Sequence, residues 1–70
     1  MKMELVQKEL KAWGEVIIVT ASGEKFELHL GDTQFDMENR VIRLQTPTSK
    51  FVIDGDAIDV VEMHLGHVDS

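Results

Sequence analysis

The sequence predicts a mainly β domain, in which a short N-terminal helix is followed by a five-stranded, strongly bent antiparallel barrel. Three observations predict it. Apolar residues recur at helical spacing only over residues 2–13, and short β-branched or alternating runs separated by turn signals fill about 15–65. Gly31 and Gly55 stand where such a short sheet would have to bend in order to close. Seventy residues make a single domain, 1–70.

The helix is predicted over residues 2–13 because its larger apolar residues fall near one face. These residues are Leu5, Val6, Leu10 and Trp13. Gly14 follows them and suits the position just after a helix, where a left-handed backbone is common. We expect the four side chains to cover one open end of the barrel. A strand is the competing interpretation, because Met3, Leu5 and Gln7 also alternate.

Two strands are predicted next. Residues 15–20 contain four consecutive β-branched residues, which is typical of a strand buried on both faces. Gly23 lies in the turn that follows, where it can supply a positive φ. Residues 25–30 alternate between charged or polar and apolar side chains, which indicates a strand with one buried face. A bend or bulge is then expected at Gly31 and Asp32.

The remaining three strands are predicted over residues 40–46, 51–54 and 57–65. A turn at Glu38 and Asn39 precedes the first of them. Pro47 cannot donate a ladder hydrogen bond, so the chain turns there before the second. Gly55 separates the second from the third. We expect residues 66–70 to be frayed.

Composition limits the classes of function. The formal net charge is −6, with 13 acidic against 7 basic residues, so long-range electrostatics oppose binding to nucleic acid. Cysteine is absent, which excludes disulfides and thiolate metal sites. The longest uninterrupted apolar stretch runs only from Val16 to Val19, far short of the roughly 20 residues that span a bilayer. We therefore expect a cytoplasmic protein that has no membrane partner.

Residues for catalysis or metal binding are not expected from the sequence. The serines fall in predicted turns or at the terminus, and no glycine-rich phosphate loop or zinc-protease motif occurs. His64 and His67 are three residues apart on a predicted strand, so they would point to opposite faces, and His29 is distant in sequence. We therefore predict a protein that is not an enzyme, with no cofactor and no metal site.

The order of these elements resembles the Sm-like (Lsm/Hfq) family of small β-barrels, and two motifs extend the resemblance over residues 4 to 65. The first reads as Val16 to Val19, Gly23, Leu30, the segment Asp36-Met37-Glu38-Asn39, then Ile42 and Leu44. The second reads as Val52-Ile53-Asp54-Gly55-Asp56-Ala57-Ile58, continued by Val61. There are three departures from the family pattern. Leu28 replaces a glycine, the Asp-to-Asn spacing is one residue short, and Asp54 replaces the arginine of an Arg-Gly pair.

The resemblance implies a uracil-binding pocket formed by Met37, Asn39, Asp54 and Gly55. Asn39 would contact a base edge, and Met37 or Glu38 would take the position that stacks on a base face. Asp54 would set a negative charge against the RNA. It also implies a homo-oligomeric ring of about five to seven subunits, whose two exposed strand edges pair between neighbours. In the family, the strand matching 51–54 pairs with the strand matching 57–63 of the next subunit.

Two functions follow as hypotheses. The first is a ring that binds single-stranded, U-rich RNA through stacking and base-edge hydrogen bonds. The second is a structural or protein-interaction ring of the same fold that has lost RNA binding. Asn39 and the resemblance favour the first, whereas Asp54 and the net charge of −6 favour the second.

Overall fold

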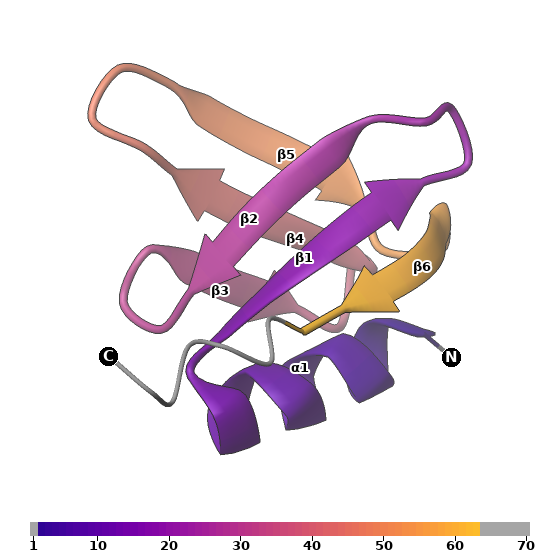
Figure 1. Ribbon diagram of the computed structural model, residues 1–70. Helices are drawn as coiled ribbons and strands as arrows, with labels where there is room; N and C mark the ends of the chain where they lie inside the picture. The colour runs from indigo at the N-terminus through magenta and orange to yellow at the C-terminus, as the bar shows by residue number, and fades with distance from the viewer. Residues whose placement is uncertain (1, 64–70) are drawn as a thin grey trace.

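The computed structural model describes residues 2–63 of the chain as one helix followed by six strands (Figure 1). The elements are α1 (Lys2–Trp13), β1 (Glu15–Thr20), β2 (Lys25–His29), β3 (Thr33–Asp36), β4 (Val41–Gln45), β5 (Lys50–Asp54) and β6 (Ile58–Glu62). The mainly β class and the helix over 2–13 are confirmed. The expected continuation of the last strand to residue 65 and the fraying of 66–70 fall outside the described residues.

The strands form two three-stranded antiparallel sheets, in the orders β2-β1-β6 and β3-β4-β5. The prediction of five strands in a closed barrel was therefore wrong in its count, and the described strands do not close into one barrel. The difference in strand count arises at the end of the second predicted strand. It ends at His29, the chain turns through Gly31 with a φ of 99°, and a separate strand β3 begins at Thr33. The carboxylate of Asp32 fixes this turn by accepting a 3.0 Å hydrogen bond from the N–H of His29.

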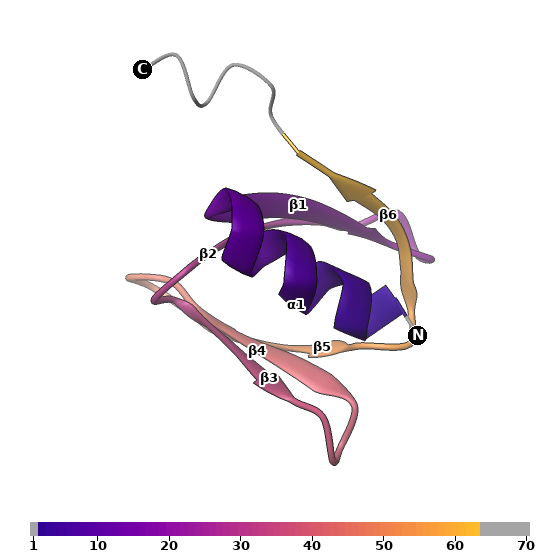
Figure 2. The same ribbon diagram turned by 90° about the horizontal axis from the view of Figure 1, so that it is seen from below.

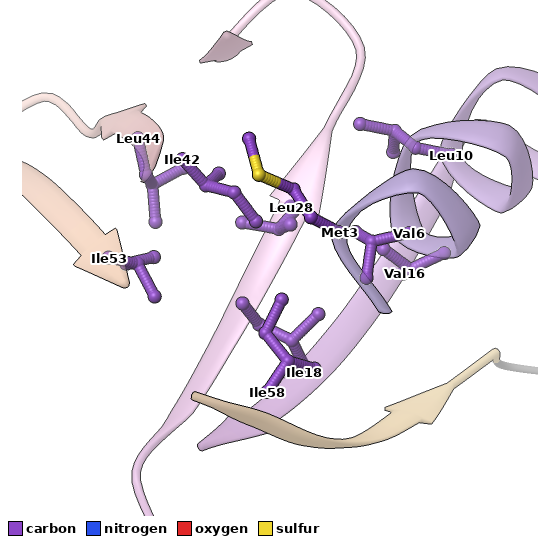
Figure 3. Close-up of a cluster of buried hydrophobic side chains, with 10 residues drawn as sticks. All are labelled: Met3, Val6, Leu10, Val16, Ile18, Leu28, Ile42, Leu44, Ile53 and Ile58. Atoms are coloured by element: carbon purple, nitrogen blue, oxygen red, sulfur yellow. The ribbon is translucent and has the colours of Figure 1, made fainter. Parts of the chain in front are cut away.

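The two sheets face each other, and α1 covers one open side of the space between them (Figure 2). Side chains from the helix and from both sheets fill that space (Figure 3). The buried apolar residues are Met3, Val6, Leu10, Val16, Ile18, Leu28, Ile42, Leu44, Ile53 and Ile58. They join the helix and both sheets in one hydrophobic core.

The helix buries Val6 and Leu10 as predicted, but Met3 takes the place of Leu5 on the buried face. Met3, Val6 and Leu10 are 1% exposed or less, whereas Leu5 is 44% exposed and Trp13 is only half-buried. Residues spaced by three and four form one stripe on a helix, so burying Met3 with Val6 and Leu10 turns Leu5 toward solvent.

Strand β1 is buried mainly on one face. Val16, Ile18 and Thr20 are buried, while the alternate residues Ile17 and Val19 are intermediate. The prediction of full burial on both faces was wrong because no described element packs on the outer face of this sheet. Among the described residues, no helix is long and apolar enough to cross a membrane.

Candidate interaction site at the β3–β4 and β5–β6 turns

The turn between β3 and β4 and the turn between β5 and β6 lie side by side. They hold Met37, Asn39 and Gly55 of the predicted pocket, and Asp54 is the last residue of β5, next to them. Val41 and Asp54 are register partners where β4 pairs with β5. Just beyond them, the N–H of Gly55 donates a 2.8 Å hydrogen bond to the carbonyl oxygen of Arg40. The ladder between β4 and β5 thus brings the segment around Asn39 next to Gly55.

Gly55 lies in a close contact between the turns and the helix. It is buried, and a Cβ atom placed on it would lie 2.5 Å from the Sδ of Met3 and 2.9 Å from the carbonyl oxygen of Arg40. Real Cβ atoms essentially never approach other heavy atoms so closely. Packing against Met3 therefore requires glycine here, independently of any ligand.

Asn39 is exposed, but its side chain already has a partner. Its Nδ2 donates a 2.9 Å hydrogen bond to Asp36, whose other carboxylate oxygen accepts the backbone N–H of Asn39 at 3.1 Å. These bonds, together with a 3.2 Å contact from Arg43, hold the pKa of Asp36 below its usual value. Asn39 therefore orders the turn, and it could offer its amide to a base edge only by giving up this bond.

Met37 and Asp54 differ in environment. Met37 is half-buried and packs against the hydrophobic core, so part of its surface remains open to a ligand. Asp54 is exposed, and its Oδ1 accepts a 2.9 Å hydrogen bond from the N–H of Asp56. This bond resembles the Asx turns by which Asp stabilises tight turns. This hydrogen bond within the turn accounts for an aspartate at position 54 without any ligand.

Arg40 lies at the centre of the two turns. Its backbone is in the left-handed region, with a φ of 58°, which few residues other than glycine adopt. Its guanidinium donates to Glu4 of the helix and, at 2.8 Å, to Asp56 of the β5–β6 turn. Hydrogen bonds, of which the one from Arg40 contributes most, lower the pKa of Glu4 from 4.5 to about 2, and the bond from Arg40 also lowers the pKa of Asp56.

Sequence reasoning did not single out this arginine bridge as part of the site, because its partners are 36 and 16 residues away. No spacing rule links such distant residues. The bridge also changes the charge available to a ligand. The chain has two arginines, and both Arg40 and Arg43 already contact carboxylates.

A shallow hollow of about 240 Å³ lies on the outer face of the β3-β4-β5 sheet. Basic side chains of Arg43 and Lys50 line it together with Gln34 and Val52. Four basic residues of the chain lie outside the helix, and the structure brings these two together. Lys25 lies on the other sheet, and Arg40 is held by Glu4 and Asp56.

Two strand edges next to these turns expose apolar side chains. Within residues 2–63, β5 pairs only with β4, and β6 pairs only with β1. Val52 on β5 is 65% exposed and Val60 on β6 is 47% exposed. Phe51 is also exposed on one edge and packs edge-to-face on Phe26. Such edges are able to pair with a strand of another chain.

Comparison of the chain with protein-family models, with curated proteins and with solved structures found no match.

Proposed function

We propose that this chain is a self-assembling, Sm-like interaction module, in which β5 of one copy pairs with β6 of the next. The observation that carries the proposal is the pair of edges, β5 and β6, which have no second neighbour among residues 2–63 and expose Val52 and Val60. A heterologous contact of this kind closes into a ring when its rotation permits. The resemblance to Sm-like proteins implies about five to seven copies.

Complementarity between the two edges supports a particular register. If Val52 faces Val60 in an antiparallel pair, then Lys50 faces Glu62 and Phe51 faces Val61. Lys50, Val52, Val60 and Glu62 are all exposed, while Val61 packs on the core. The register therefore matches an apolar pair and an opposite-charge pair on the outer face, each of which stabilises a sheet.

The other two edge strands, β2 and β3, are less suited to pairing, which favours β5 and β6 as the edges that pair. β2 exposes Lys25 and Glu27 along its edge, and β3 is only four residues long with exposed Gln34. Charged side chains and short strands are two of the ways in which proteins protect an edge from pairing.

Binding of single-stranded RNA is the second candidate. Partial exposure of Met37 and the hollow that Arg43 and Lys50 line favour it. Two features oppose it at the predicted pocket. Asp54 replaces a cation there, and Glu4 and Asp56 take up the charge of Arg40. We therefore place assembly first and expect any RNA binding to be weak.

A charge swap across the proposed edges tests assembly. Light scattering should give a multiple of the chain mass for the wild type. Lys50→Glu and Glu62→Lys should each shift the protein toward smaller species by placing like charges opposite each other, and the double variant should restore the oligomer. Lys25→Glu, an equal charge change on β2, is the matched control and should leave the mass unchanged. A wild-type monomer at every concentration would exclude the proposal.

A further inference from the structure

A cluster of potential metal ligands lies on the outer face of the β2-β1-β6 sheet, away from the two turns. Glu15, Glu27 and His29 each offer one ligand atom, and these atoms lie within 4.8 Å of one another. The strand register produces this arrangement. Glu15 is directly opposite His29, and Glu27 faces Ile17, two residues further along β1. Side chains two apart on a strand share a face, so all three project to the same side.

The imidazole of His29 is oriented by two carboxylates. Its Nε2 lies 3.3 Å from Oε1 of Glu15, and its Nδ1 lies 3.4 Å from Oδ2 of Asp32. Metal-binding histidines nearly always direct their second ring nitrogen to a carboxylate or carbonyl in this way. With Asp32 beside Nδ1, Nε2 is the nitrogen that faces Glu15.

Asp32 is itself held in place. Its Oδ1 accepts hydrogen bonds from the Thr33 hydroxyl at 2.6 Å and from the His29 N–H at 3.0 Å. These two hydrogen bonds fix the position of the carboxylate, so that its Oδ2 stays beside Nδ1 of His29 and orients the ring.

We propose that Glu15, Glu27 and His29 bind a divalent transition-metal ion of the zinc type, with Asp32 as the residue that orients His29. One imidazole nitrogen and two carboxylate oxygens are a donor set that Zn²⁺ accepts, and three protein ligands leave a position for water. Ligand bonds of about 2.0–2.2 Å place donor atoms roughly 3.3–3.5 Å apart. His29 and Glu15 already meet that spacing, and the exposed Glu27 side chain is free to rotate toward them.

Charge also favours a dication here. Three carboxylates surround a single imidazole, and Lys25 is the basic residue nearest to them along β2. A cross-strand ion pair between Glu15 and protonated His29 is the alternative explanation, and it needs neither Glu27 nor a metal. The cluster does not depend on the β5 and β6 edges, so its test is independent of assembly.

Calorimetric titration with ZnCl₂ tests the site. All variants carry His64→Gln and His67→Gln, so that His29 is the one remaining histidine. This background should bind one Zn²⁺ per chain and unfold at a higher temperature with zinc than without it. His29→Gln and Glu27→Gln should each weaken binding at least about tenfold, and Asp32→Asn by roughly 10–100-fold, as expected for a residue that orients a ligand.

Glu24→Gln is the matched control, because it removes an exposed carboxylate just before β2, at the opposite end of the β1–β2 hairpin from Glu15 and His29. It should leave the zinc affinity within about twofold. Circular dichroism of each variant checks that the fold is retained. No binding by the background protein at about 100 µM zinc would overturn the proposal. Equal affinity in well-folded His29→Gln would overturn it as well.

Discussion

The N–H of Gly55 donates a 2.8 Å hydrogen bond to the carbonyl oxygen of Arg40, which ties the β5–β6 turn to the β3–β4 turn. The same two residues hold the start of the helix. Gly55 makes room for Met3, and the side chain of Arg40 binds Glu4. Helix, turns and sheet edge are thus joined at one point, and changes at either residue should affect all of them.

Replacing Gly55 with alanine should destabilise the fold by about 1–3 kcal/mol, the usual cost of overpacking a core. The added methyl group would press on Met3 and on the Arg40 carbonyl. Denaturant unfolding of the two proteins measures the difference in free energy. A change below about 0.5 kcal/mol would show that the turn relaxes freely.

A double-mutant cycle separates overpacking from other effects of the alanine. Met3→Val shortens the side chain that the new Cβ would meet, so Gly55→Ala should cost less in that background. Gly31→Ala is the control, because Gly31 has a φ of 99° and a Cβ atom added there would meet nothing within 4 Å. Its cost comes from backbone strain and should be the same with Met3 or with Val at position 3.

Acid should weaken the arginine bridge over a defined range of pH. The folded pKa of Glu4 is depressed from 4.5 to about 2, so the bridge stabilises the protein above about pH 4.5 and loses this contribution as the pH falls to about 2. The lowered pKa of Asp56 acts in the same direction. Arg40→Gln should therefore lower the melting temperature by a few degrees near neutral pH and by almost nothing near pH 2.

Thermal unfolding of wild type and Arg40→Gln between pH 7 and pH 2 measures this convergence. Arg40→Lys is the control, because it keeps the charge but cannot bridge two carboxylates with one planar fork. It should fall between the other two proteins. A gap that stays constant with pH would mean that Arg40 acts through its backbone conformation and not through its ion pairs.

The burial pattern of the helix predicts which of two truncations costs more stability. Leu10→Ala should cost about 2–5 kcal/mol, because Leu10 is 1% exposed in the core. Trp13 is only half-buried, so Trp13→Ala should cost less, about 1–2 kcal/mol, and not the 3–5 kcal/mol expected of a full core position. Denaturant unfolding compares them, and a larger loss for Trp13→Ala would contradict the observed packing.

Local signals in the sequence predicted most of the elements but not which residues are buried. Gly14, with a φ of 97°, ends the helix at the expected place. Met3 packs against Gly55, which lies about fifty residues away in the chain, so local signals could not show that Met3 is buried and Leu5 is not. Strand β3 was missed because it contains one large apolar residue, Phe35. The strand is defined by its pairing with β4.

The candidate site could likewise be predicted only in part from the sequence. Motif comparison located two turns that the structure does bring together through the pairing of β4 with β5. It could not reveal the partners of Asn39, or that Arg40 reaches Glu4 and Asp56. The cluster of Glu15, Glu27 and His29 also depends on the register of β1 with β2, which the sequence alone does not specify.

A lysine at position 52 should prevent assembly. Val52 is the most exposed large apolar residue on β5, and the proposed register sets it against Val60 of a neighbouring copy. A charge there would be buried without a partner, whereas it is harmless on an isolated chain. Light scattering should show Val52→Lys as a monomer with unchanged circular dichroism. Leu5→Lys, an equal change at an exposed helix position, should keep the wild-type mass.

Placing arginine at position 54, as in the Arg-Gly pair of the Sm-like pattern, tests the RNA candidate. If the pocket binds a base through Asn39 and Met37, Asp54→Arg removes a repulsive carboxylate and adds a charge-assisted contact worth about 1.5–3 kcal/mol. Affinity for an oligo-U strand should then rise roughly tenfold or more, since about 1.4 kcal/mol is a factor of ten. Fluorescence anisotropy with labelled oligo-U at low salt measures it.

Asp54→Asn is the control that the structure provides for this test. Asparagine keeps an oxygen for the N–H of Asp56, so the turn is retained while the negative charge is lost. Its affinity should lie between those of the wild type and Asp54→Arg, and Asn39→Ala should abolish the gain. Affinity should also fall with salt if Arg43 and Lys50 contact phosphates. If Asp54→Arg assembles as the wild type does and still binds no RNA, no base pocket exists at these turns, and the assembly module alone accounts for the protein.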